Sequence, residues 1–554
     1  MQATLSSVSR SVRVLGNVFG SPDLRRVELA FAGFNVAEWG TWIAILVFAY
    51  EAGGAAAAGA IGVIQLIPAA IFAPFASVLG DRYRRERVLL AGYLAQSLAM
   101  GATAAALLTG ARLPVIYVLA ALAATSLTLT RPVQGALLPA LSRTPDELTA
   151  ANAAAGWIES VSMFGGPAVA GVLLGLWGPG AVFAVMSGVL GLSAILAARI
   201  EARSAPPGPR SPSAQDGALP GMVGELAGGF RALGAERRPR LVVSFMGAQS
   251  VLEGALDILL IVLAFRLLDI GSAGVGFLNA AFGVGGIVGA ALATALVARR
   301  RLAPSLLVGC ASWGAALAAI GLYPSPILAP IFVGVAGVGR PLIDVAGRTL
   351  LQRVVADRVL SRVFGVLEGL YMAGLALGLA VAPALVALLG ERGAFVAAGA
   401  FLPVLILLAR RSLAEIDAAS VIPEVRLALL RSRAIFAPLS APVLERLAAR
   451  LIPVEAPAGK AIVRQGEPGD RFYVVEEGEA EVSRDGRSVA TLGPGDFFGE
   501  IALLRDVPRT ATVAARTGLR LYALEREDFL EAVTGHPLSA RAADAVARRR
   551  ISEP

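Results

Sequence analysis

The stretch FGEIALLRDVPRTATV, Phe498 to Val513, lies near the end of a chain of 554 residues. Gly499 precedes a short apolar run that can start a helix, and Arg509 follows Glu500 by nine positions. The free N–H groups at the start of a helix attract anions, and an arginine binds phosphate through charge-assisted hydrogen bonds. A glutamate would repel phosphate but accepts a hydrogen bond from a hydroxyl group. The stretch therefore predicts a water-accessible pocket for a small anion that also carries hydroxyl groups.

Most of the chain before this stretch is too apolar for a soluble protein. Hydrophobic residues make up 56% of the sequence and charged residues only 16%, whereas soluble proteins carry about 25% charged residues. A helix needs about 20 apolar residues to cross a bilayer, and twelve such runs occur before Arg411. We expect the spans at 27–51, 54–79, 87–110, 114–138, 152–177, 180–200, 240–266, 272–298, 304–323, 326–347, 363–389 and 392–410.

The spans divide into six plus six. The segment 201–221 is rich in Pro, Ser and Gly and is typical of a flexible connector between the sixth and seventh spans. The predicted organisation is an N-terminal segment (1–25), spans one to six (26–200), a central loop (201–238), spans seven to twelve (239–411), a linker (412–424) and a soluble domain (425–550).

Arginine distribution predicts the orientation of the spans. Clusters follow the even-numbered spans, as at 82–87 and 299–301, while the opposite side shows little beyond Arg112, Arg266 and Arg392. Basic loops stay on the cytoplasmic side of a bilayer, so both termini and the central loop are expected in the cytoplasm of a multi-pass protein of the cell membrane. The first 25 residues lack the apolar core of a cleaved signal. The net charge of +8 thus indicates contact with a lipid bilayer rather than with nucleic acid.

The two halves are similar to each other, as in many transporters. Three pairs of matching features lie 209, 217 and 216 residues apart. They are Arg131-Pro132 with Arg340-Pro341, RVLLAG (87–92) with PSLLVG (304–309), and Pro167 with Pro383. The near-constant spacing favours a duplicated six-helix unit.

Three motifs of the membrane part resemble the major facilitator superfamily. SVLGDRYRRER (77–87) is similar to the cytoplasmic signature after the second span, LTLTRPVQGA (127–136) to the signature of the fourth span, and GGPAVAG (165–171) to the Gly-Pro element of antiporters. The segment 136–153 looks like the branch that includes the enterobactin exporter and drug exporters. The resemblance implies two six-helix pseudo-repeats that transport a small molecule, with Asp81 and Arg82 in gating.

Charged residues inside the spans are the candidate transport residues. Each costs about 2.5–3.5 kcal/mol on insertion scales and persists mainly where it is paired or faces water. The resemblance implies that spans one, four, seven and ten surround one central space. The charged residues of these spans are the predicted substrate and proton pathway: Glu38, Arg131, Glu253, Asp257, Arg340 and Asp344. A carboxylate can take up a proton when its arginine partner moves away, and such a carboxylate could exchange a proton for a substrate, as antiport requires. The alternative for Arg340 and Asp344 is a helix-to-helix or i,i+4 pair that only stabilises packing.

The region after Arg411 reads as a soluble β domain flanked by helices. An amphipathic helical pattern covers 423–451, and short β-type runs begin at Val454. Asp485-Gly486 marks a hairpin and 493–496 a second turn. We expect a small β-barrel or jelly roll, followed by two helices within 526–550.

This region resembles the cyclic nucleotide-binding domain shared by catabolite activator protein, the protein kinase A regulatory subunit and cyclic-nucleotide-gated channels. In that family the arginine binds the cyclic phosphate and the glutamate binds the ribose. The resemblance implies a nucleotide site at Phe498, Gly499, Glu500, Ile501, Ala502, Arg509, Thr510 and Ala511. Cyclic AMP is the favoured regulatory ligand and cyclic GMP the alternative. No helix-turn-helix pattern follows, which argues against a transcription factor.

The sequence therefore predicts a secondary active transporter, regulated by cyclic nucleotide, that exports a small or amphipathic substrate by proton exchange. Two alternatives remain open at this point: a membrane sensor or anchor that signals to a partner, and an exporter of cyclic nucleotide itself. An enzyme is not expected, because the sequence has one histidine and no pattern for metal ligands, nucleotide hydrolysis or a Ser/His/Asp set. No cofactor or metal is predicted, and the oligomeric state and the substrate are not determined.

Overall fold

The computed structural model describes residues 21–142, 145–200, 230–231, 233–234, 237–297, 303–355, 357–419, 424–439 and 441–552. The chain forms two compact units whose main division lies between Arg411 and Ser412, and the described residues 349–355 are grouped with the second unit. We call them the membrane unit and the C-terminal unit and describe each by itself.

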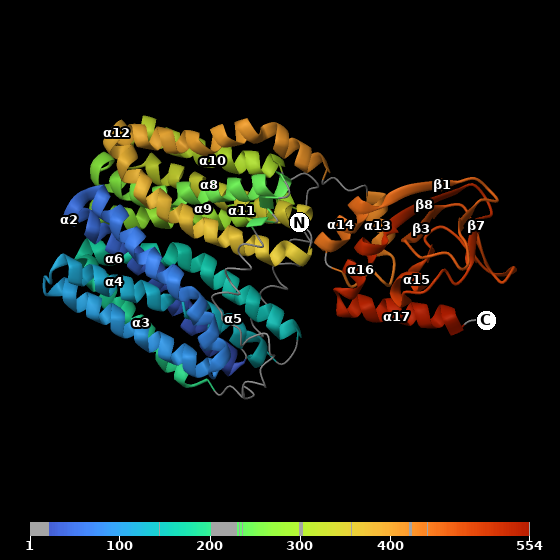
Figure 1. The fold of residues 1–554 in the computed structure, drawn as a ribbon. Coiled ribbons are helices and arrows are strands. Elements are labelled where there is room, and N and C mark those ends of the chain that lie inside the picture. Colours follow the sequence, from blue (N-terminus) through green and yellow to red (C-terminus); the bar gives the residue numbers. More distant parts are fainter. Residues whose placement is uncertain are drawn as a thin grey trace, which may run out of the picture. The chain divides into compact units, whose positions relative to one another are not determined.

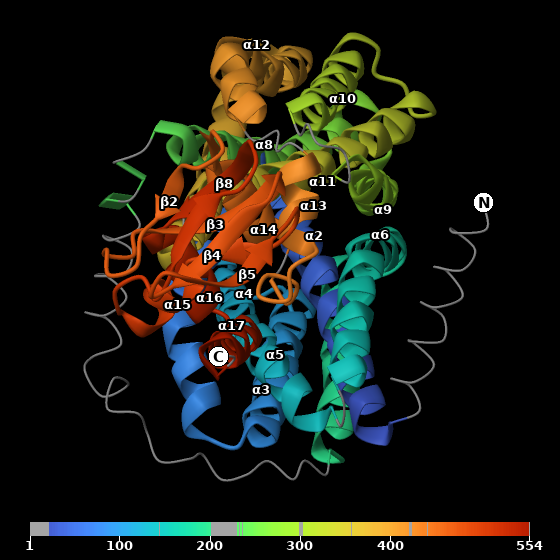
Figure 2. The ribbon, with the colours of Figure 1, turned by 90° about the vertical axis from the view of Figure 1, so that its right-hand side faces the viewer.

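The membrane unit consists of long helices in two groups. Figures 1 and 2 show α2 to α6 as one group and α8 to α12 as the other. The first group contains α2 (Pro22–Arg82), α3 (Arg85–Leu108), α4 (Leu113–Leu127), α5 (Thr130–Leu141) and α6 (Pro145–Ala198). The second contains α8 (Arg237–Val262), the π-helical turn η2 (Leu263–Leu267), α9 (Gly271–Val297), α10 (Ala303–Leu322), α11 (Leu328–Val354) and α12 (Asp357–Ala419).

Three of these helices are interrupted at glycines. The φ angle is 69° at Gly54 in α2, 77° at Gly178 in α6 and 71° at Gly390 in α12. Glycine reaches positive φ without the steric cost that a side chain imposes. The three interruptions lie at the boundaries between predicted spans one and two, five and six, and eleven and twelve.

Eight helical segments of the described chain are long and apolar enough to cross a bilayer. They are 22–69, 85–108, 113–139, 150–198, 271–293, 304–322, 328–352 and 362–411, and α8 is not among them. Helices satisfy their own backbone hydrogen bonds, which lipid cannot do. The chain is therefore a multi-pass helical membrane protein.

Small residues bring the two groups of helices into close contact. A Cβ atom added at Gly276 of α9 would lie 2.3 Å from the Cα of Gly171 in α6. Within the first group, one added at Gly166 of α6 would lie 2.8 Å from the Cβ of Trp39 in α2. Small residues let membrane helices approach closely, so Gly166 and Gly171 of GGPAVAG (165–171) act here in helix packing.

The C-terminal unit contains two four-stranded antiparallel sheets, in agreement with the predicted β domain. One sheet has the order β1 (Ile452–Ala456), β8 (Leu519–Glu525), β3 (Arg471–Glu477) and β6 (Phe497–Phe498). The other has the order β2 (Ala461–Val463), β7 (Thr512–Ala515), β4 (Ala480–Arg484) and β5 (Arg487–Leu492). The β4–β5 hairpin turns at Asp485 and Gly486, both at positive φ (51° and 79°), which suits the right-handed twist of the strands.

In the described part of the C-terminal unit, five helices accompany the sheets. They are α13 (Glu424–Arg431), α14 (Ala441–Arg450), α15 (Glu500–Arg505), α16 (Arg526–Thr534) and α17 (Pro537–Ser552). The helical pattern predicted over 423–451 forms two helices separated by turns at 432–439. Pro438 lies in these turns, and because a proline disfavours helical geometry at the residue before it, one continuous helix cannot cover 423–451.

Aromatic rings join the helices of the C-terminal unit to its first sheet. The ring of Phe472 on β3 stacks on that of Phe529 on α16, with centroids 4.7 Å apart. Phe436 packs edge-on against both rings. This core fixes the sheet against which the candidate nucleotide site is built.

Candidate functional site

Arg509, which lies between α15 and β7, is held in a single orientation. Its side chain is only 3% exposed. Nη2 donates to the carbonyl oxygen of Arg471 (2.8 Å) and to Oδ1 of Asp470 (3.1 Å), and Nη1 donates to the carbonyl oxygen of Gly499 (3.2 Å). The guanidinium also lies 5.9 Å from the ring centroid of Tyr473. The arginine is therefore positioned by the protein itself.

Gly499 permits this arrangement. It has φ 92° and immediately precedes α15, as the sequence predicted. A Cβ atom at this position would lie 2.5 Å from Nη1 of Arg509 and 2.8 Å from the carbonyl oxygen of Arg471. Both the backbone angle and the space therefore require glycine.

Glu500, the first residue of α15, is buried and bonded to the last helix. Its side chain is 1% exposed, and its Oε1 accepts a hydrogen bond from Nη1 of Arg550 on α17 (2.9 Å). Burial raises the pKa of the Glu500 carboxyl above its ordinary value, although the guanidinium of Arg550 lowers it again. Arg550 also donates to the carbonyl oxygen of Phe497 (2.7 Å) and covers the Phe497 ring at 4.5 Å.

The other residues of the predicted nucleotide site differ in how far they are buried. Phe498, Ile501 and Ala502 are buried, and the Phe498 ring stacks on Tyr473 at 4.9 Å. Thr510 and Ala511 are half-buried. The eight residues thus combine a buried support with the polar groups of Glu500 and Arg509. Sequence reasoning missed Asp470 and Arg550, whose partners are 39 and 50 residues away.

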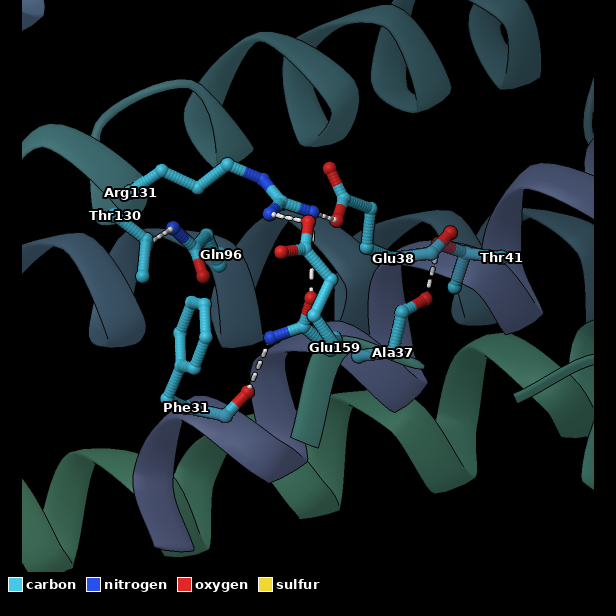
Figure 3. Close-up of polar contacts among 9 residues, drawn as sticks. Phe31, Ala37, Glu38, Thr41, Gln96, Thr130, Arg131 and Glu159 are labelled. Carbon is cyan, nitrogen blue, oxygen red and sulfur yellow. Dashed lines mark hydrogen bonds and ion pairs between the residues drawn. The ribbon is translucent and has the colours of Figure 1, made fainter. Parts of the chain in front are cut away.

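In the membrane unit, Arg131 is shared by two carboxylates. Its Nη2 lies 2.6 Å from Oε2 of Glu38 on α2, and its Nη1 lies 2.5 Å from Oε1 of Glu159 on α6. Figure 3 shows the three side chains pointing toward one another. Nη2 also donates to Oδ1 of Asn35 (3.2 Å). Arg131 itself lies on α5, so three helices meet at what we call the Arg131 cluster, namely Glu38, Arg131 and Glu159.

The second half has a related group, the Arg340 cluster of Glu253, Asp257 and Arg340. Nη2 of Arg340 on α11 lies 2.7 Å from Oε1 of Glu253 on α8. One turn further along α8, Oδ2 of Asp257 accepts a hydrogen bond from Nε1 of Trp42 on α2 (3.1 Å). The two neighbouring carboxylates of α8 therefore have different partners.

Asp344 does not pair with Arg340. Its Oδ1 lies 3.1 Å from Nε of Arg348, and Nη2 of Arg348 lies 3.9 Å from Oε2 of Glu368 on α12. The i,i+4 alternative considered for Arg340 and Asp344 is therefore wrong, because the Arg340 guanidinium is bound to a carboxylate on another helix. We call Asp344, Arg348 and Glu368 the Arg348 cluster.

The predicted gating residues Asp81 and Arg82 end α2. Their side chains lie outside the described residues, so their role stays a prediction.

The two halves share one ion pair at matching positions. Glu38 and Glu253 are 215 residues apart, and Arg131 and Arg340 are 209 residues apart. Each half thus joins a glutamate of its first span to an arginine of its fourth. The first pair is more accessible, since Arg131 and Glu38 are 39% and 31% exposed whereas Arg340 and Glu253 are 25% and 12% exposed.

Several buried polar atoms were not anticipated. Among the described residues, both carboxylate oxygens of Glu28, Oε1 of Gln249 and Oε2 of Glu253 are buried without a hydrogen-bond partner. Gln249 lies one helical turn before Glu253, and this spacing is the signal that could have drawn attention to it.

Fold and site together define a multi-pass helical membrane protein that carries a separate β domain with an arginine-glutamate site. Residues 29–334, more than half of the chain, match the Major Facilitator Superfamily, and residues 453–536 match the Cyclic nucleotide-binding domain. The chain belongs to the Major Facilitator Superfamily and carries a C-terminal cyclic nucleotide-binding domain.

Two curated relatives are similar to a short part of this chain. The cAMP-dependent protein kinase regulatory subunit of Yarrowia lipolytica is 55% identical over 73 residues, which cover 13% of this chain and 20% of the relative. That of Schizosaccharomyces pombe is 43% identical over 86 residues, or 15% and 21% of the two chains. The chain thus spans about a fifth of the length of these relatives. Among solved structures, the regulatory domain of Toxoplasma gondii PKA with cAMP is 32% identical, covering 23% of this chain and 47% of that one, with a TM-score of 0.20.

Proposed function

We propose that this protein is a secondary active transporter whose conformational equilibrium is regulated by a cyclic nucleotide. The observation that carries the proposal is that Glu500 and Arg509 are both buried, each bonded to other residues, in a chain whose membrane unit belongs to a transporter superfamily. A domain that kept only its fold would have no need to hold these two side chains in place.

The ligand of the C-terminal domain is cyclic AMP, with cyclic GMP as the alternative. Arg509 would bind the cyclic phosphate and Glu500 a ribose hydroxyl, as the chemistry of the two groups requires. The match to two subunits named as cAMP-dependent supports cyclic AMP. Phe498, Gly499, Ile501, Ala502, Thr510 and Ala511 would form the surrounding wall.

The hydrogen bond between Arg550 and Glu500 supplies a route from the nucleotide to α17. A ribose hydroxyl bound to Glu500 competes with Arg550 for the same carboxylate, so nucleotide binding would change how α17 is held. Allosteric coupling is typically about 1–3 kcal/mol, which is enough to bias an equilibrium between two transporter conformations.

The helices support twelve spans. Of the eight apolar segments, those containing Gly54, Gly178 and Gly390 each divide into two spans, which gives eleven. The 26 residues of α8 provide the twelfth, because at 1.5 Å per residue they extend about 39 Å. Both termini and the C-terminal domain are proposed to face the cytoplasm, because the arginine distribution favours that orientation in a cell membrane.

Transport is proposed to be proton-coupled export of a small or amphipathic molecule. One guanidinium balances one carboxylate, so in the Arg131 cluster the second carboxylate can take up a proton without leaving an unpaired charge. The Arg340 cluster offers the same choice between Glu253 and Asp257. Asp81 and Arg82, at the end of α2, would act in gating.

The test compares the parent protein with Arg509→Glu in proteoliposomes, using a substrate first identified by its effect on thermal stability. We expect cyclic AMP to change the transport rate of the parent and to leave Arg509→Glu unaffected. Arg516→Glu is the matched control, because Arg516 is 61% exposed and pairs with Glu479 on the surface. An equal response of the parent and Arg509→Glu would contradict regulation through this site.

A further inference from the structure

Three arginines in the membrane unit are each outnumbered by carboxylates. Arg131 is bound by Glu38 and Glu159 at 2.6 and 2.5 Å. Arg348 faces Asp344 at 3.1 Å and Glu368 at 3.9 Å. The third, Arg340, is bound by one of the two carboxylates of its cluster at 2.7 Å.

These clusters carry a formal surplus of negative charge. The clusters contain six carboxylates and three guanidinium groups, which leaves three negative charges when all the groups are ionised; five of the carboxylates lie within ion-pair distance of an arginine, and Asp257 is bonded to Trp42 instead. In the Arg131 and Arg340 clusters, whose residues all lie inside predicted spans, the surplus carboxylate needs a positive partner or a proton. An organic cation supplies that partner, whereas an anion would add to the repulsion.

A second observation indicates the hydrogen-bonding character of the ligand. Gln249, Glu253 and Asp257 lie at i, i+4 and i+8 on one face of α8. Gln249 is 4% exposed and its buried Oε1 has no partner among the described residues, and the same holds for Oε2 of Glu253. Both free atoms are acceptors, so the missing group is a donor.

We infer that the transported substrate is an organic cation with N–H donors, a protonated amine on an apolar body, held by this face of α8. The inference rests on the proposed transport function and narrows its substrate class. The surplus charge and the unfilled acceptors favour it independently. The same carboxylates accept a proton when the amine leaves, which matches exchange of a cation for a proton.

The test uses two matched series of ligands, built on naphthalene and on pyrene, that differ only in the group on the ring. Each series contains the methylamine, which is a cation, the methanol, which is neutral, and the acetate, which is an anion. Binding to the purified full-length protein is measured as the rise in unfolding temperature and as a dissociation constant. We expect the amines to bind more tightly than the alcohols and the acetates to bind least.

Substitutions on α8 locate the effect. Glu253→Gln and Asp257→Asn are each expected to weaken amine binding about tenfold, the size of one charge-assisted hydrogen bond, and to change alcohol binding little. Asp257→Asn keeps an oxygen that can accept from Trp42, so it stays informative if Glu253→Gln fails to fold. Glu51→Gln is the matched control, because Glu51 is an exposed acidic residue of α2 outside the three clusters.

Three results would overturn the inference: acetates that bind as tightly as amines, substitutions on α8 that affect amines no more than Glu51→Gln does, or no binding by either series. Transport of an acetate or alcohol under cyclic AMP control would contradict a cationic substrate but would support the proposed transport function. If cyclic AMP binds but nothing that binds the membrane unit is transported, the proposed transport function fails as well.

Discussion

Two arginines of this protein are held by protein groups in opposite ways. Arg509 in the C-terminal unit is 3% exposed and bonds to two backbone carbonyl oxygens and to one carboxylate, that of Asp470, which is 69% exposed. Arg131 in the membrane unit is 39% exposed and is shared by two carboxylates. The first arginine keeps most of its positive charge for a ligand, while the second is more than neutralised by its neighbours.

The contrast shows that an arginine in a site does not by itself mean that the ligand is an anion. Its effective charge depends on how many carboxylates share it, because each ion pair at short distance cancels most of its field. Arg509 is suited to a phosphate. Arg131 and its surplus carboxylate are suited to a proton or an organic cation.

The most severe test of this contrast is Arg509→Glu. Loss of two charge-assisted hydrogen bonds costs about 3–6 kcal/mol, and the new carboxylate repels the phosphate. We expect cyclic AMP affinity to fall by at least about 100-fold, measured by titration of the full-length protein. Arg516→Glu should bind like the parent, and comparable losses in both variants would show that the effect is only one of net charge.

Gly499→Ala tests whether the position of Arg509 matters as much as its charge. The added methyl group would lie 2.5 Å from Nη1 of Arg509 at a residue with φ 92°, and left-handed geometry costs a non-glycine residue about 1–2 kcal/mol. We expect at least about tenfold weaker cyclic AMP binding and a lower unfolding temperature. Gly518→Ala, which meets no atom within 4 Å, is the control, and equal behaviour of the two variants would argue against the steric account.

Removing Arg131 should expose the repulsion between its two partners. In Arg131→Gln the carboxylates of Glu38 and Glu159 face each other without a cation, so we expect a loss of stability of about 1–3 kcal/mol. Adding Glu159→Gln should restore part of the loss, which a double-mutant cycle of unfolding temperatures would measure. Strictly additive effects would mean that Arg131 and Glu159 are not coupled.

The nucleotide site should also respond to pH through Glu500. Burial raises the pKa of this carboxyl, so the proton binds at a higher pH than to an ordinary glutamate. Cyclic AMP affinity is expected to fall as the pH is lowered through that raised pKa, because a protonated carboxyl is a weaker acceptor for the ribose hydroxyl. Glu500→Gln should bind more weakly with little dependence on pH, and parallel pH curves for the two proteins would exclude Glu500 as the titrating group.

The smallest change is expected for Arg550→Gln. Glu500 loses its competing partner, so we expect cyclic AMP affinity to change by no more than about fivefold, roughly 1 kcal/mol, while the effect of the nucleotide on transport is reduced. Arg548→Gln is the control, because Arg548 is 72% exposed and pairs with Asp544 on the same helix. Unchanged regulation in Arg550→Gln would remove α17 from the proposed route.

Local features of the chain were predictable where they depend on neighbouring residues. The glycine interruptions of α2, α6 and α12 lie at the boundaries between predicted spans because apolar length and the freedom of glycine at positive φ are properties of short segments. The hairpin at Asp485-Gly486 follows from turn chemistry in the same way. The helical pattern over 423–451 did not reveal that the helix ends at Arg431 and that a second one begins at Ala441.

Composition and short motifs along the chain were enough to identify the charged residues of the membrane unit and the stretch that forms the proposed nucleotide site. The partners of these residues came from packing: Glu159 for Arg131, Arg348 for Asp344 and Arg550 for Glu500. Two of these pairs join residues 28 and 50 positions apart. The third was decided by packing as well, because Glu253 of another helix binds Arg340, so that Asp344 pairs with Arg348 instead. Side chains on different helices compete for one guanidinium, and packing alone settles which of them comes within hydrogen-bonding distance.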